Sequence, residues 1–178
     1  MDLLIADASI LDGTGAPAFR GTVGVTGDRI AAVLPPGTAE PQAARRIEAE
    51  GLVLAPGFVD VHQHSDLSPF TEPSMDSYLR QGVTTCVVGN CGSSAFPAEG
   101  VPELAALAGS RGLEASWRTF GEYLEAVEAC RPALNVGALV GHGTLREAVL
   151  GADQRRPPTA EEAAEMRRLL ASALEEGA

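Results

Sequence analysis

The sequence predicts an α/β protein in which a small β unit precedes parallel strands that alternate with helices. Short apolar segments separated by turn residues fill residues 1–55, whereas strand patterns alternate with helical patterns from residue 56 onward. The second rhythm is typical of parallel α/β architecture. We therefore expect two domains, residues 1–55 and residues 56–178, and we find no internal repeat.

In the first domain, short strands are expected at residues 3–5, 9–11, 22–25 and 30–34. Asp7-Ala8 separates the first two. Thr26-Gly27-Asp28 separates the last two and is a hairpin signal, because glycine supplies the positive φ that such turns need. Residues 47–54 then lead into the second domain. A β unit this short needs further strands for independent stability.

In the second domain, strands are expected up to His64, at residues 83–88 and at residues 135–140, and helices at residues 73–81, 102–108, 119–130 and from residue 159 onward. Thr119 with Glu122, and Thr159 with Glu162, form capping boxes that begin two of these helices. Residues 83–88 are a continuous β-branched run, which predicts a strand buried on both faces. The last helix carries an apolar stripe that includes Met166 and Leu170.

The composition limits the possible partners and compartments. A net charge of −11 argues against nucleic acid or an anionic membrane as partner, since both attract cationic surfaces. The three cysteines show no paired spacing, the first residues do not resemble a signal peptide, and no apolar stretch approaches a membrane span. A soluble, cytoplasmic protein is expected.

Two histidines one residue apart end the apolar segment Gly57-Phe58-Val59-Asp60-Val61-His62-Gln63-His64. Side chains alternate along a strand, so His62 and His64 share a face. Two neighbouring imidazoles at the end of a buried strand provide half of a transition-metal site. The alternative is a pair of partly exposed histidines in a loop.

Other residues with metal-binding side chains follow the next two expected strands. Cys91 follows the strand at residues 83–88, and His142 ends the strand at residues 135–140. Imidazoles with a thiolate suit Zn²⁺ better than Mg²⁺ or Ca²⁺, which prefer oxygen ligands. Free cysteine is often only a small buried apolar residue, so the residue type alone leaves both roles of Cys91 open. Cys86 lies within a strand and is expected in the core, and Cys130 has no evident role.

Three motifs carry a family resemblance. The segment Pro56-Gly57-Phe58-Val59-Asp60-Val61-His62-Gln63-His64 resembles the first-strand signature of the amidohydrolase superfamily, metal-dependent hydrolases built on a barrel. Residues 81–92 and Gly141-His142-Gly143-Thr144-Leu145-Arg146 resemble the D-aminoacylase branch, the N-acyl-D-amino-acid deacylases. Gly89-Asn90-Cys91-Gly92 is the most specific element, and the likeness extends from about Leu3 to the last residue.

The resemblance implies a partial (β/α)₈ TIM-like barrel of the amidohydrolase type, preceded by the N-terminal part of a small β-sandwich. A complete barrel needs about 250 residues, so the chain is expected to be the N-terminal part of a larger enzyme. It also implies that His62 and His64 hold a weakly bound metal. Cys91 would bind the tightly held zinc, in place of the carboxylated lysine of many relatives. The general base, an aspartate, is expected beyond residue 178.

The implied activity is zinc-dependent hydrolysis of an N-acyl-D-amino acid, a small-molecule substrate, and the isolated chain is expected to be inactive. One alternative is a cyclic-amide hydrolase of the dihydroorotase or hydantoinase type. Gly-Asn-Cys-Gly argues against it, as does the absence of lysine, because such enzymes need a carboxylated lysine. A second alternative is a non-catalytic fragment that lacks the general base.

Four further residues are candidates for roles around the metal. Asp60 is expected either to hydrogen-bond a ligating imidazole or to make a structural hydrogen bond at the barrel floor. Asp66 is expected either to contact substrate or to be a solvated loop acid. His142 lies near the predicted barrel mouth and suits a substrate-pocket role or a structural one. Arg146 is expected to pair with a carboxylate, in the pocket or in a surface salt bridge.

Overall fold

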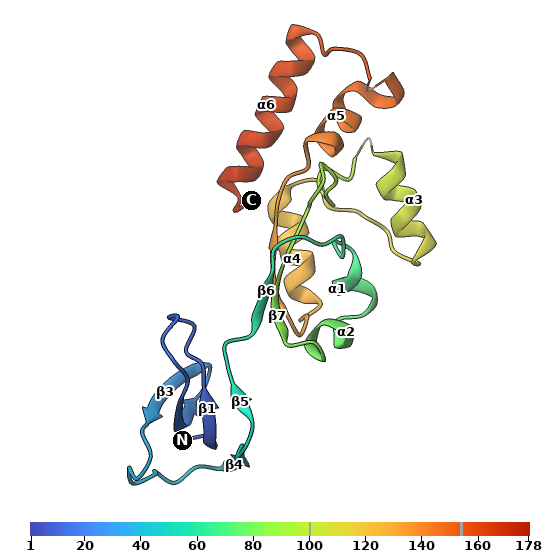
Figure 1. Cartoon of the computed structure of the whole chain (residues 1–178). Coiled ribbons are helices and arrows are strands. Elements are labelled where there is room, and N and C mark those ends of the chain that lie inside the picture. Colours follow the sequence, from blue (N-terminus) through green and yellow to red (C-terminus); the bar gives the residue numbers. More distant parts are fainter. Residues whose placement is uncertain (100, 154) are drawn as a thin grey trace. The chain divides into compact units, whose positions relative to one another are not determined.

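The computed structural model describes residues 1–99, 101–153 and 155–178 (Figure 1). Contacts between Cα atoms divide the chain into two compact units, Met1–Pro56 and Gly57–Ala178. This division lies one residue beyond the boundary expected from the sequence. Within the described ranges, none of the helices has both the length and the apolar character needed to cross a bilayer.

The first unit is one mixed five-stranded sheet, formed by β1 (Leu3–Ile10), β2 (Phe19–Thr26), β3 (Arg29–Leu34), β4 (Arg45–Glu48) and β5 (Val53–Leu54). Strand β2 pairs antiparallel with both β1 and β3. Strands β4 and β5 each pair parallel with β1. Thr26 pairs with Arg29 across a two-residue turn in which Gly27 has φ of 59°. The hairpin therefore occurs where the sequence predicts it.

The separation of residues 3–5 and 9–11 into two strands was wrong, because β1 is continuous. Asp7 adopts a left-handed conformation with φ of 58°, and the register with β2 shifts between Ile5 and Ala8. The polar interruption in the sequence is thus a β-bulge, which accommodates an extra residue without ending the strand.

The second unit contains a parallel sheet of β6 (Phe58–Asp60), β7 (Val83–Val88) and β8 (Asn135–Ala138), in the order β6-β7-β8. Its helices are α1 (Ser68–Thr71), α2 (Asp76–Leu79), α3 (Pro102–Ser110), α4 (Phe120–Ala129), α5 (His142–Leu150) and α6 (Ala160–Glu175), with a 3₁₀ turn at Gly151–Asp153. Helix α6 packs against α5 and α4 (Figure 1). Neighbouring parallel strands joined through helices agree with the α/β class.

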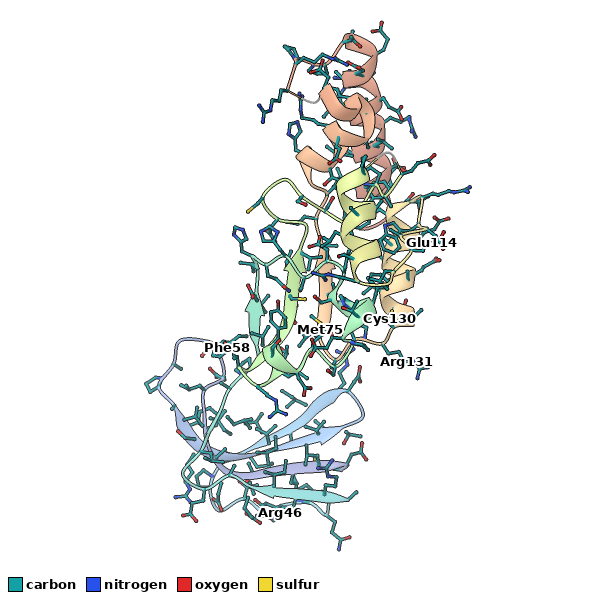
Figure 2. The ribbon with its side chains drawn as sticks, turned by 90° about the vertical axis from the view of Figure 1, so that its right-hand side faces the viewer. Arg46, Phe58, Met75, Glu114, Cys130 and Arg131 are labelled. Carbon is teal, nitrogen blue, oxygen red and sulfur yellow. The ribbon has the colours of Figure 1, made fainter. Side chains whose placement is uncertain are left out.

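Strand β7 is more deeply buried on one face, and its burial on both faces, which is expected of the complete barrel, stays a prediction. Cys86 and Val88 are buried beside Met75 and Leu134, whereas Thr85 and Val87 on the opposite face are only half-buried. Met75 lies beside the sheet in Figure 2. The described residues cover the sheet on the Cys86 side, and the other face remains accessible to water.

The helix expected at residues 73–81 is shorter than predicted. Met75 has φ of 47°, outside the helical region, and only Asp76–Leu79 form a regular turn of helix, with α1 standing separately before it. Met75 is fully buried in the core next to β7. Burial of this side chain outweighs the local helical pattern.

Both predicted capping boxes are present. Thr119 and Thr159 accept hydrogen bonds from the backbone amides of Glu122 and Glu162, and each glutamate reaches back to its threonine's amide. Hydrogen bonds from the Arg156 guanidinium, followed by the Thr159 amide, lower the pKa of Glu162 to about 2. These contacts fix the start of α4 and of α6 at the predicted residues.

Candidate metal centre

Three side chains with metal-binding atoms meet beyond the carboxyl ends of β6 and β7. The ligand atoms of His62, His64 and Cys91 all lie within 4.8 Å of one another. Nε2 of His62 lies 3.0 Å from Sγ of Cys91, and the two imidazole centroids are 5.9 Å apart. All three residues are exposed. The structure thus brings together the three residues that the sequence proposes as metal ligands.

Strand topology explains why residues so far apart in sequence converge. Strands β6 and β7 are parallel neighbours, so their carboxyl ends lie at the same edge of the sheet. The chain then turns sharply after β7, where Gly89, Cys91 and Gly92 all have positive φ. Cys91 has φ of 56°, a conformation that costs free energy for a residue with a side chain.

Asn90 links the cysteine loop to the histidine segment. Its Nδ2 donates hydrogen bonds to the backbone oxygen of Val87 at 2.8 Å and to that of Gln63 at 3.4 Å. Gln63 lies between the two histidines, so one amide holds both sides of the site. Sequence reasoning did not assign this role to Asn90, and its only signal was the selective Gly-Asn-Cys-Gly motif.

The donor set fits a zinc ion. Zinc binds nitrogen at about 2.0 Å and sulfur at about 2.3 Å, so paired ligand atoms in a tetrahedral site lie about 3–4 Å apart. The 3.0 Å separation between His62 and Cys91 is close to this spacing. Two imidazoles and a thiol are poor ligands for Mg²⁺ or Ca²⁺.

Asp60 contacts His62, but through the backbone. Its Oδ1 accepts a hydrogen bond from the His62 amide nitrogen at 3.2 Å, rather than from an imidazole. The carboxylate therefore constrains the chain direction at His62.

Asp66 is partly buried, so its interpretation as a solvated loop acid was wrong. Burial raises the pKa of Asp66, against the opposing effects of backbone amides and of His64. Its Oδ1 is buried and has no hydrogen-bond partner among the described residues. Asp66 and His64 border a small cavity of about 90 Å³ that Ser93 and Ser94 also line.

His142 and Cys91 line the same open hollow, which has a volume of about 460 Å³. Residues 89–92 and 139–142 form part of its wall, and Leu170 and Leu174 of α6 contribute apolar side chains to it. His142 is the first residue of α5 and is exposed. It lies outside the group of three ligand atoms, so the structure places it beside the metal candidates and not among them.

Arg146 has a structural contact. Its Nη2 donates a hydrogen bond to the backbone oxygen of Arg156 at 2.7 Å, which joins α5 to the segment before α6. The side chain also borders a second hollow, with His142 and Met166.

The two other cysteines lie apart from the candidate ligands. Cys86 is fully buried in the core, and burial raises the pKa of its thiol. Cys130 caps the C-terminal end of α4, next to Arg131 (Figure 2). Only Cys91 combines exposure with two imidazole neighbours, which agrees with the distinction drawn from the sequence.

A model of the amidohydrolase family matches residues 45–178. The chain belongs to the amidohydrolase family. The resemblance inferred from the motifs is therefore confirmed.

Two curated relatives come from Alcaligenes xylosoxydans xylosoxydans. The chain is 42% identical over 178 residues to an N-acyl-D-glutamate deacylase, and the match covers 100% of this chain and 36% of the relative. It is 41% identical over 179 residues to a D-aminoacylase, with 99% and 36% coverage. The chain thus spans little more than a third of the length of these relatives.

Solved structures give the same relationship. The N-acyl-D-glutamate deacylase from Bordetella bronchiseptica, complexed with zinc and a phosphonate inhibitor that mimics the tetrahedral intermediate, matches with a TM-score of 0.85 at 42% identity. That match covers 98% of this chain and 36% of that one. A D-aminoacylase matches with a TM-score of 0.87 at 42% identity, covering 99% and 37% of the two chains.

Proposed function

We propose that this chain is the N-terminal part of a zinc-dependent N-acyl-D-amino-acid deacylase, which releases a carboxylate and a D-amino acid. The observation that supports this most strongly is the convergence of His62, His64 and Cys91 within 4.8 Å. Identity of 42% to an N-acyl-D-glutamate deacylase along the whole chain adds the substrate class. When bound, zinc would polarise the scissile carbonyl and lower the pKa of a coordinated water.

The residues of this chain would hold and orient that ion. Cys91 contributes a thiolate to the tightly held zinc, and His62 and His64 form a weaker position beside it. The Asp60 carboxylate fixes the backbone at His62, and the Asn90 amide fixes the cysteine loop against Gln63. The hollow bordered by Cys91, His142 and Leu170 receives part of the substrate.

A carboxylate must accept a proton from the attacking water and deliver it to the leaving amine. We place this general base, an aspartate, in residues that follow Ala178, together with two further histidine ligands.

The three βα units of the second unit would then be the first part of a (β/α)₈ barrel. The five-stranded sheet would be one part of a β-sandwich. All three cysteines are free, which supports a reducing, cytoplasmic location.

A substrate assay on the full-length gene product tests the proposed function. We expect zinc-loaded protein to release free amine from N-acetyl-D-glutamate, N-acetyl-D-aspartate or N-acetyl-D-leucine and to leave the L-enantiomers nearly unchanged. Hydantoin and dihydroorotate serve as cyclic-amide controls. Hydrolysis of the cyclic amides alone, or no amide hydrolysis by zinc-loaded protein, would contradict the proposal.

Substitution of either histidine of the pair should separate the two metal positions. In the full-length protein, His62→Asn and His64→Asn are expected to retain one tightly bound zinc per chain and to lose activity, because both imidazoles border the reacting carbonyl. Zinc content and kcat/KM are measured together. His142→Asn is the matched control and should keep the metal content of the parent. Parental rates in both His62→Asn and His64→Asn would show that the two histidines have a structural role and do not take part in catalysis.

A further inference from the structure

Two buried hydroxyl groups join the cysteine loop to the start of α5. Ser94 and Thr144 are only 6% and 5% exposed. The Ser94 amide donates to Thr144 Oγ1 at 2.9 Å, and the Gly141 amide donates to Ser94 Oγ at 3.0 Å. Ser94 Oγ in turn donates to the backbone oxygen of Phe96 at 2.5 Å. Each hydroxyl is thus held by defined partners.

The backbones of these two segments also touch directly. The Thr144 amide donates to the Gly92 oxygen at 3.0 Å. A Cβ atom added at Gly141 would lie 2.5 Å from the Gly92 oxygen, and one added at Gly143 would lie 2.7 Å from it. Only glycine at both positions allows this approach. Residue 92 is therefore locked against residues 141–144.

The contact between Gly92 and residues 141–144 constrains the backbone of Cys91. Cys91 immediately precedes Gly92 and is held at φ of 56°, with its Sγ 3.0 Å from Nε2 of His62. A strained backbone conformation persists only where surrounding contacts enforce it. The hydrogen bonds of Ser94 and Thr144 provide such enforcement on the C-terminal side of Cys91.

We infer that Ser94 and Thr144 are positioning residues that set the Cys91 thiolate against the His62 and His64 imidazoles for metal binding. This inference rests on the proposed function, since it assigns Cys91 as a ligand. It also explains the selective Gly-His-Gly-Thr motif: the two glycines and the threonine hold the cysteine loop, independently of any role of His142.

The test uses Co²⁺ as the probe, because a cobalt–thiolate bond gives a charge-transfer absorption band that reports Cys91 directly. In metal-free full-length protein, Thr144→Val should bind Co²⁺ about tenfold more weakly than the parent, as is usual for residues that orient ligands. Its charge-transfer band should be reduced. Thr144→Ser, which keeps the hydroxyl, should restore both. Ser94→Ala should weaken binding in the same direction and provides a second variant if Thr144→Val does not fold.

Thr119→Val is the matched control, since it removes the hydroxyl that caps the N-terminus of α4. It should lower thermal stability without changing the affinity for Co²⁺. Parental affinity and band in folded Thr144→Val or Ser94→Ala would overturn the inference, as would equal loss of affinity in Thr119→Val. A parent without the band, or a band that survives in Cys91→Ser, would contradict the proposed function itself and, with it, the positioning role.

Discussion

Replacement of Cys91 by alanine in the full-length protein is expected to remove the tightly bound zinc and to abolish turnover. The substitution deletes the thiolate that makes this donor set selective for zinc. Loss of a direct ligand should exceed the 10–100-fold effects that are typical of residues orienting the ligands. The zinc content per chain is measured by inductively coupled plasma mass spectrometry, and kcat/KM is measured with an N-acetyl-D-amino acid.

Cys86→Ala is the matched control for that experiment. Cys86 is fully buried beside Val88 and Leu134, so its truncation should cost about 1 kcal/mol of stability through packing alone. Zinc content and rate should stay near the parental values. Parental zinc content and activity in Cys91→Ala would refute the assignment of Cys91 as a ligand.

Residues 1–178 expressed without any following residues are expected to aggregate or to be poorly ordered, and to lack deacylase activity. Strand β6 is an edge strand of its sheet, and apolar side chains in and after it are largely exposed: Phe58 is 66%, Val59 is 58% and Val61 is 65% exposed. An open, apolar strand edge is a template for pairing with other chains.

Size-exclusion chromatography, thermal unfolding and a deacylase assay on the same preparation check this expectation. The full-length gene product is the control and should elute as a discrete species and hydrolyse substrate. A compact monomer of residues 1–178 that unfolds cooperatively and cleaves N-acetyl-D-amino acids would show that the machinery lies entirely within this segment.

Local signals in the sequence predicted the elements that depend on neighbouring residues. The capping boxes at Thr119 and Thr159 and the turn at Gly27 are set by a few consecutive residues, and all three occur as expected. The incorrect predictions concern elements whose structure depends on contacts between residues far apart in the sequence. Burial of Met75 against β7 interrupts a helical pattern, and pairing with β2 turns the segment around Asp7 into a bulge.

In the candidate site, too, some features could be predicted from the sequence, and others depend on contacts between distant residues. His62, His64 and Cys91 were predictable as a group because parallel neighbouring strands end at one edge of the sheet. The hydrogen bonds that hold these three residues in place could not be predicted from the sequence. Asn90 reaches Gln63 across 27 positions, and Ser94 reaches Thr144 across 50. Such hydrogen bonds leave no periodic pattern in the sequence. The partial burial of Asp66 likewise depends on distant residues that pack around it.

Anomalous diffraction at the zinc absorption edge, from crystals of the full-length protein, tests the central claim most directly. We predict a zinc peak within about 2.3 Å of Sγ of Cys91, the usual zinc–sulfur distance, and further metal, at lower occupancy, at the imidazoles of His62 and His64. A zinc peak at other residues, with Sγ of Cys91 free of metal, would contradict the account.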